Sequence, residues 1–213
     1  MARSAAPRLI AITDLGVLPE PELVARLRRL AELAEAGGVA LLLRDHTASA
    51  TQRLHLGQAL RDVARGSGQE LWVADRLDLA LLLEADGIHL GEASVPAPAA
   101  RRLVGDTVRI SRAWHLPALV AAAEDELDAV DALLLSPVLA RRKGRLALGL
   151  AGLGGLGEQL RARGKACQLY ALGGILPENA GECRAAGAFG VAAIGAALAA
   201  DPGPLLAALE LRR

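Results

Sequence analysis

The chain has 213 residues with 24 basic and 24 acidic side chains, so its formal net charge is zero. Such a chain carries no global field for nucleic acid or anionic membranes, which excludes partners recognised mainly through charge. Hydrophobic residues make up 53% and aromatic residues 2%, which predicts one aliphatic core in a single domain over residues 1–213.

Short apolar segments alternate along the chain with longer segments rich in Ala, Leu, Glu and Arg. The apolar segments predict strands over residues 8–13, 39–44, 70–74, 87–89, 108–111, 132–136, 168–172 and 190–194. The segments between them predict helices over residues 20–36, 48–65, 77–84, 97–104, 117–126, 150–163, 177–186 and 202–211. Alternation at this spacing indicates parallel strands joined by right-handed crossovers.

The fold class that this pattern predicts is α/β, as a single (β/α)8 TIM barrel. The strand segments are hydrophobic throughout, as in sheets covered on both faces. The alternative is a doubly wound open sheet, but the Gly-x-Gly-x-x-Gly turn expected after its first strand is absent. We expect branched side chains to fill the barrel interior, namely Ile10, Ile12, Leu41, Leu43, Val73, Ile110, Leu133, Leu135 and Val191.

The sequence also predicts a cytoplasmic protein. No apolar run reaches the length of a membrane span, and residues 1–7 lack the apolar core of a signal peptide. Cys167 and Cys183 have no metal-ligand spacing, so we interpret them as reduced packing residues. Monomer and homodimer both remain open.

Polar side chains follow most of the predicted strands, where barrels of this kind hold their active sites. The candidates are Arg44, Asp75, Glu92, Arg112 and His115. A helix cap is the commoner role of an aspartate that follows a strand, and this alternative applies to Asp75. His115 has the alternative of a loop or cap residue.

Two further segments predict an anion site. The basic stretch of residues 141–145, which includes Lys143, places four cations in five residues on the carboxyl face; a solvated loop is the alternative. The pair Gly173-Gly174 follows a predicted strand, and Pro177 opens the next helix. Glycine allows the backbone to approach a phosphate, which the positive end of a helix favours. An ordinary strand-to-helix turn explains a lone glycine pair equally well.

Several motifs occur in a fixed order along the chain. They include residues 11–14 (Ala-Ile-Thr-Asp), 75–80 (Asp-Arg-Leu-Asp-Leu-Ala), 85–91 (Ala-Asp-Gly-Ile-His-Leu-Gly), 136–137 (Ser-Pro), 173–179 (Gly-Gly-Ile-Leu-Pro-Glu-Asn) and 186–191 (Ala-Gly-Ala-Phe-Gly-Val). As an ordered set they resemble the thiamine phosphate synthase/TenI superfamily over nearly the full length. The resemblance implies a barrel of thiamine biosynthesis that binds a phosphorylated thiazole, with Gly173, Gly174 and Gly195 at the phosphate.

The superfamily contains two activities. In the synthases, the thiazole phosphate attacks a pyrimidine carbocation that forms as Mg²⁺-bound pyrophosphate leaves a pyrimidine diphosphate. The resemblance places an Asn-Asp pair where this chain has Ala74-Asp75, a metal-binding Asp at Ser94, and a Thr-x-Thr-Lys loop at residues 140–145. Asp75 remains as a metal ligand and Glu92 is a displaced substitute, so we expect weak Mg²⁺ binding or none.

The TenI-like tautomerases isomerise a thiazole carboxylate phosphate by moving a proton and need no cofactor. Their Gly-Arg-Ser-x-His pattern matches Arg112 and His115 in Ser-Arg-Ala-Trp-His. The resemblance implies that His115 is the acid/base and that Arg112 or Arg44 holds the carboxylate, and histidine titrates in the range that this requires.

Three hypotheses follow from the resemblance. We place the tautomerase first because the metal ligands of the synthase pattern are incomplete. The synthase, with Mg²⁺ as its cofactor, is the alternative. A catalytically silent barrel that binds the phosphorylated thiazole is the third.

Overall fold

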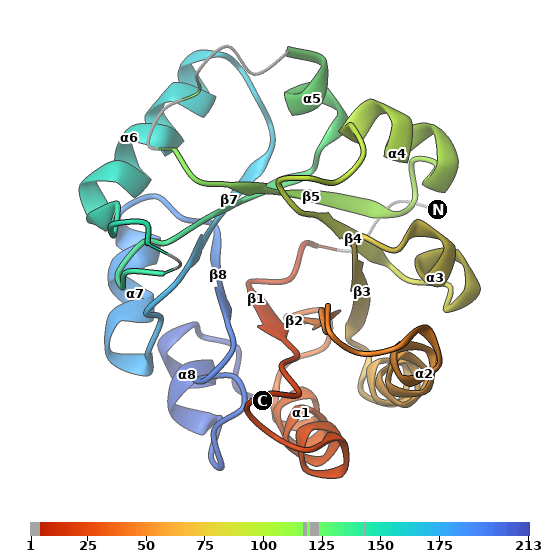
Figure 1. Cartoon of the computed structure of the whole chain (residues 1–213). Helices are drawn as coiled ribbons and strands as arrows, with labels where there is room; N and C mark the ends of the chain where they lie inside the picture. Colours follow the sequence, from red (N-terminus) through yellow and green to blue (C-terminus); the bar gives the residue numbers. More distant parts are fainter. Residues whose placement is uncertain (1–4, 117–118, 120–123, 143) are drawn as a thin grey trace.

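The computed structural model describes residues 5–116, 119, 124–142 and 144–213. The strands are parallel and close into one barrel in chain order, and the helices surround it as a ring (Figure 1). The strands are β1 (Leu9–Ile12), β2 (Val39–Leu43), β3 (Glu70–Ala74), β4 (Gly87–Leu90), β5 (Arg109–Trp114), β6 (Ala132–Leu135), β7 (Gln168–Leu172) and β8 (Gly190–Ala193). The helices are α1 (Glu20–Leu33), α2 (Ala50–Ser67), α3 (Leu77–Leu82), α4 (Ala97–Val104), α5 (Glu124–Ala129), α6 (Gly149–Ala162), α7 (Pro177–Ala185) and α8 (Gly203–Ala208). The predicted (β/α)8 barrel is confirmed.

The predicted elements agree with the observed ones to within a few residues at most boundaries. β5 extends to Trp114, three residues beyond its prediction, because residues 112–114 continue the pairing with β6. The helix predicted over 117–126 falls largely outside the described residues. Its described part, α5, begins with Glu124 and its first turn is acidic, which complements the helix dipole.

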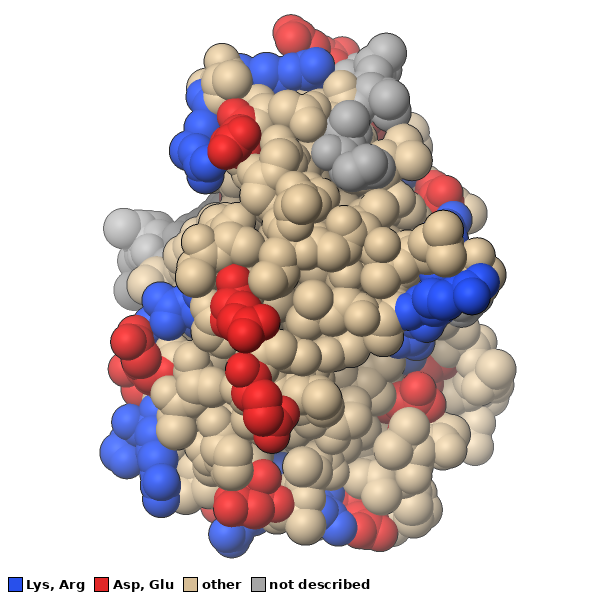
Figure 2. Space-filling view, turned by 90° about the vertical axis from the view of Figure 1, so that its left-hand side faces the viewer, with Lys and Arg blue, Asp and Glu red and all other residues tan. Residues whose placement is uncertain are grey.

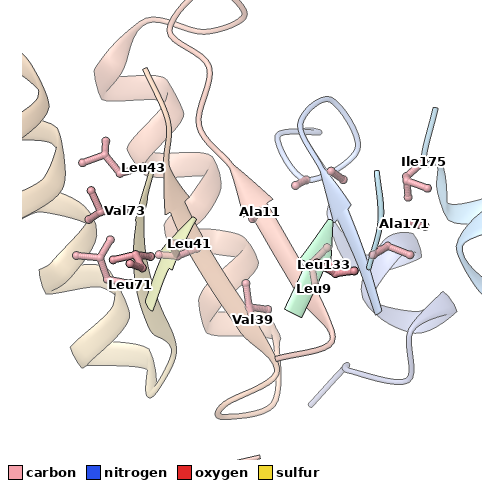
Figure 3. Packing of buried hydrophobic residues seen from close by; sticks show 14 of the residues in the cluster. Leu9, Ala11, Val39, Leu41, Leu43, Leu71, Val73, Leu133, Ala171 and Ile175 are labelled. Carbon is pink, nitrogen blue, oxygen red and sulfur yellow. The ribbon is translucent and has the colours of Figure 1, made fainter. Parts of the chain in front are cut away.

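Two layers of buried side chains hold the barrel together. The inner layer, inside the barrel, consists of Ile10, Ile12, Ala40, Leu42, Trp72, Ala74, Ala132, Leu134, Tyr170 and Ala192. The outer layer lies between the strands and the helices, where Figure 3 shows Leu43, Leu71 and Val73 on the helix side of their strands.

The predicted interior is therefore wrong for most of its members. Ile10 and Ile12 lie inside, but Leu41, Leu43, Val73, Ile110, Leu133, Leu135 and Val191 belong to the outer layer. Because both faces of each strand are apolar, the sequence carries no signal for which alternate residues point inward.

The amino end of the barrel is closed by aromatic and polar side chains. The Trp72 ring packs over Gly87, where an added Cβ would lie 2.6 Å from ring atoms. The Trp72 Nε1 donates to Glu70 at 2.8 Å, and Arg109 pairs with Glu70 at 3.1 Å. The Tyr170 hydroxyl donates to the carbonyl of Pro7 at 2.6 Å. These contacts fill the amino end of the barrel interior.

On the side formed by α6, α7 and α8, the outer surface gives little indication of a charged partner. The face over α6, α7 and α8 carries few charged side chains across its middle (Figure 2). None of the helices in the described part of the chain combines the length and apolar character that a membrane crossing requires.

Candidate active site

A cavity of about 410 Å³ opens at the carboxyl ends of the strands. Its lining combines an apolar floor with charged and polar side chains, namely Ile12, Arg44, His46, Asp75, His89, Gly91, Glu92, Ala113, His115, Ser136, Pro137, Arg142, Arg145, Leu172 and Ile194. These residues come from strand ends far apart in sequence. The chemistry of the site therefore depends on barrel closure.

The first candidate, Arg44, is held by a polar link between β1 and β2. The Thr13 hydroxyl donates to the buried Asp45 carboxylate and accepts a hydrogen bond from the Arg44 N–H at 2.8 Å. The other Asp45 oxygen accepts from the Leu15 N–H at 2.7 Å. This network fixes the backbone from which the Arg44 guanidinium enters the cavity.

Arg142, from the loop between β6 and α6, brings a second guanidinium to the Arg44 side of the cavity. Burial and repulsion by Arg142 lower the pKa of Arg44, against the attraction of nearby aspartates. Within the described part of the chain, neither guanidinium group has a hydrogen-bond acceptor or a salt-bridge partner. Two such groups without a direct counter-ion form a strong attraction for an anion.

Asp75 lies at the carboxyl end of β3 with φ of 62°, a left-handed conformation that aspartate tolerates better than most residues. Its Oδ1 accepts from the Gly91 N–H at 2.9 Å and from the Ser94 hydroxyl. Its Oδ2 lies 3.8 Å from His46 Nδ1. Although burial alone would raise the pKa of Asp75, the hydrogen bonds from Ser94 and Gly91 outweigh it and lower that pKa. The Asp75 carboxylate therefore already accepts two hydrogen bonds from the protein.

Glu92 lies on the opposite rim and is mostly exposed. Its Oε2 accepts from Arg145 Nη2 at 2.8 Å, and this hydrogen bond lowers the pKa of Glu92. The same oxygen lies 3.8 Å from His115 Nε2. Glu92 thus joins the basic loop after β6 to the histidine after β5.

His115 is oriented by the end of β6. Its Nδ1 lies 2.7 Å from the Ser136 carbonyl oxygen and 3.1 Å from the Ser136 hydroxyl. A carbonyl oxygen can only accept, so Nδ1 carries the proton, and in the neutral ring Nε2 is the acceptor. Nε2 therefore points its lone pair toward the cavity side, where Glu92 lies. This arrangement suits proton transfer.

His89 lies deeper, at the floor of the cavity. It is buried, and its Nδ1 lies 3.0 Å from the Ser111 hydroxyl, which in turn donates to the Ile88 carbonyl at 3.2 Å. Burial lowers the pKa of His89 to about 4, so the ring is neutral near pH 7. His89 therefore belongs both to the cavity lining and to the buried interior.

The glycine turn after β7 packs against the loop after β6. Gly173 and Gly174 have φ of 102° and 76°, and an added Cβ on Gly174 would lie 2.8 Å from the Ala140 Cβ. The Asn179 side chain bridges this turn, accepting from the Leu176 N–H and donating to the Gly174 carbonyl, both at 2.9 Å. Both glycines are thus required by the fold.

Gly195 differs from the glycine pair because no heavy atom lies within 4 Å of an added Cβ. In the described part of the chain, the N–H groups of Gly173, Gly174 and Gly195 have no hydrogen-bond acceptor. Their neighbours Leu172 and Ile194 line the cavity. These donors are available to a ligand at this end of the cavity.

Two predicted site residues are not brought together with the others. Arg112 points outward from β5, and its Nη1 donates to the Val95 carbonyl at 2.9 Å. With Trp114 and Glu126 it lines a separate small cavity beside α5. Of the two arginines predicted to hold the substrate carboxylate, Arg44 lines the cavity and Arg112 does not. The prediction for Lys143 lies outside the described residues. Sequence reasoning chose Lys143 from the basic stretch, whereas Arg142 and Arg145 line the cavity.

The residues of the cavity do not fit a protein-bound Mg²⁺, which prefers octahedral oxygen ligands. Asp75 Oδ1 is occupied by two donors and Glu92 by Arg145. Among the residues that the structure describes, no group of three or more His, Cys, Asp or Glu side chains converges in a way that could hold a metal ion. Guanidinium groups outnumber free carboxylate oxygens here.

Comparisons with known proteins agree with the fold. The family model described as thiamine monophosphate synthase matches residues 9–197. A thiamine-phosphate synthase of Moorella thermoacetica is 37% identical over 164 residues, which cover 77% of this chain and 76% of that protein. One of Natronomonas pharaonis is 37% identical over 180 residues, 82% of each chain. The solved thiamine phosphate pyrophosphorylase of Pyrococcus furiosus superposes with a TM-score of 0.79 at 29% identity, covering 95% of both chains.

The buried His89 generates a prediction about pH. Its pKa is about 4 in the folded chain and 6.5 ordinarily, so between these values the unfolded chain binds a proton that the folded chain does not. The free energy of unfolding should therefore fall as the pH falls from 6.5 to 4, by up to about 3 kcal/mol from this group.

Urea unfolding across this pH range measures the effect. His89→Gln should flatten the pH dependence, because it removes the buried titrating group. Equal pH dependence in wild type and His89→Gln would contradict the assignment.

Proposed function

The chain belongs to the thiamine monophosphate synthase family, and we propose that it joins a pyrimidine diphosphate to a thiazole phosphate with release of diphosphate. The observation that carries this proposal is the convergence of Arg44, Arg142 and Arg145 on one cavity. Both reactions involve a thiazole phosphate, but the diphosphate leaving group of the synthase adds several negative charges, whereas the carboxylate of the tautomerase substrate adds one. The comparisons favour the same activity, so the order of the two enzymatic hypotheses from the sequence is reversed.

The proposed reaction is a group transfer. The bond between the pyrimidine methylene carbon and the diphosphate oxygen breaks, and its electron pair leaves with that oxygen. The thiazole nitrogen then uses its lone pair to form a bond to the methylene carbon, so no proton is gained or lost. Guanidinium groups placed where the negative charge develops stabilise its departure. The apolar floor of Ile12, Ala113 and Leu172 would support the two rings.

We place the thiazole phosphate at the N–H groups of Gly173, Gly174 and Gly195. The support for this proposal is that these donors lack acceptors and lie at one end of the cavity, next to α7, which begins with Pro177. Backbone donors before a helix favour phosphate. The diphosphate would then lie at the other end, near Arg44 and Arg142.

The two kinds of glycine give a prediction. Gly174→Ala should lower the free energy of unfolding by about 1–3 kcal/mol, because the new methyl group would contact the Ala140 backbone and the residue has positive φ. Gly195→Val should keep its stability within about 0.5 kcal/mol but lose thiazole phosphate binding, because its side chain would project into open space at the proposed phosphate.

Urea unfolding and calorimetry with the thiazole phosphate measure these effects. Gly181→Val, at an exposed glycine of α7 with nothing within 4 Å of an added Cβ, is the control for an added branched side chain. Wild-type binding by Gly195→Val would place the phosphate elsewhere.

The synthase proposal is tested by turnover. Given both substrates, the protein should form thiamine phosphate and release diphosphate. Arg44→Gln should lower kcat by about 10²–10³, the usual loss when one stabilising donor is removed. Arg26→Gln, whose side chain pairs with Glu22 on the surface of α1, is the control that should keep full activity. Absence of thiamine phosphate under these conditions would reject the proposal.

A thiazole tautomerase remains the second candidate, and the orientation of His115 favours it. The Ser136 carbonyl fixes the protonated Nδ1, so Nε2 is free to remove a ring proton from one carbon and return it to another. Arg44 would then hold the substrate carboxylate, since Arg112 points away from the cavity.

This candidate is tested with the thiazole carboxylate phosphate alone. If the protein isomerises it, His115→Asn should lower turnover by about 10² with little change in ligand affinity. Full activity of His115→Asn would remove His115 from the reaction. Binding of both phosphorylated ligands without turnover of either would indicate the catalytically silent barrel.

A further inference from the structure

We propose that Arg44, Arg142 and Arg145 replace a protein-bound divalent cation at the diphosphate, and that Glu92 occupies Arg145 until the diphosphate displaces it. This inference rests on the proposed function, because it concerns how the same cavity compensates the charge of the leaving group.

The carboxylates of the cavity are already engaged. Asp75 Oδ1 accepts from Gly91 and from Ser94, the position at which the resemblance places a second metal-binding aspartate. These two hydrogen bonds link the end of β3 to the loop after β4 and hold Asp75 at its positive φ. Freeing Asp75 for a metal would break a link that shapes the rim. At the position where the resemblance places the second metal-binding aspartate, the chain has the Ser94 hydroxyl, which supplies no negative charge for a cation.

Arg44 and Arg142 supply positive charge without a metal. Their mutual repulsion disfavours the free site, and no direct acceptor in the described part of the chain relieves it. A ligand with several anionic oxygens removes this repulsion by accepting from both groups. Guanidinium groups bind phosphate oxygens through paired, charge-assisted hydrogen bonds, which a point charge does not provide.

Arg145 reaches the cavity from the same short hairpin as Arg142. The two residues form an antiparallel bridge, with N–H to carbonyl distances of 2.9 and 3.2 Å in the two directions. Side chains of bridged residues lie on the same face of a β-ribbon. Both guanidinium groups are therefore presented together, and both line the cavity.

Glu92 holds Arg145 in the free protein through a carboxylate, the same chemical type of acceptor as a phosphate oxygen. The pair is easy to exchange, because the side chains are 65% and 42% exposed and such ion pairs are weak. A diphosphate that enters can take Arg145 from Glu92. Glu92 then remains beside His115, 3.8 Å away.

The test is calorimetry of the whole chain with inorganic diphosphate, in EDTA and in Mg²⁺. The affinity in EDTA should equal or exceed that in Mg²⁺. Arg142→Gln and Arg145→Gln should each weaken binding by about tenfold or more, as expected for loss of a charge-assisted hydrogen bond. Glu92→Gln should tighten binding a few-fold, since it removes the competing carboxylate.

The matched control is Glu84→Gln, because Glu84 pairs with Arg65 away from the cavity and its loss should leave binding unchanged. Binding only in Mg²⁺, or wild-type affinity in both arginine variants, would overturn the inference. These outcomes are separate from the proposed function, which depends on formation of thiamine phosphate from the two substrates. Metal-independent binding of diphosphate without that product would reject the function alone.

Discussion

The alternation of side chains along the strands of a closed barrel determines what this site can contain. Each strand sends every second side chain inward, so the last inward position of each strand faces the cavity. Arg44, His89 and Ala113 meet there because they share this parity, although they lie on different strands. Arg112 has the opposite parity, and its guanidinium group contacts the Val95 carbonyl outside the barrel. A shift of one residue along a strand thus decides whether an arginine faces the cavity, as Arg44 does, or the outside of the barrel, as Arg112 does.

The sequence does not reveal which alternate residues of each strand point into the barrel. The fold, the order of the elements and the strand ends could be predicted from hydrophobic alternation, because crossover geometry leaves few other solutions. The inward-facing residues could not, since each strand is apolar on both faces. The interior contains Trp72 and Tyr170, two of the few aromatic residues, and Leu41 and Leu43 face the helices instead. A pattern motif such as Ser-Arg-Ala-Trp-His locates a segment but not the direction of its arginine.

The glycine pair after β7, for which we propose phosphate binding, also has a packing role that the sequence did not reveal. The positive φ values and the close contact with Ala140 make Gly173 and Gly174 necessary for packing the turn against the loop after β6. That loop carries Arg142 and Arg145. The turn thus supports the basic hairpin as well as offering its own N–H groups. The contact between the glycine turn and the loop after β6 therefore joins the two ends of the proposed substrate site.

The carboxylates at the carboxyl rim already accept hydrogen bonds, and this determines which groups can compensate the negative charge of a ligand. Asp75 holds a strained backbone through two donors, so its side chain works as a structural anchor of the β3 and β4 ends. Glu92 is engaged by Arg145, and neither carboxylate presents the open oxygen cage that Mg²⁺ requires. A site for the proposed diphosphate must still neutralise several negative charges. Guanidinium groups can do this only if they are brought close despite their repulsion. The bridged residues Arg142 and Arg145 meet this condition, with Arg142 on the Arg44 side of the cavity.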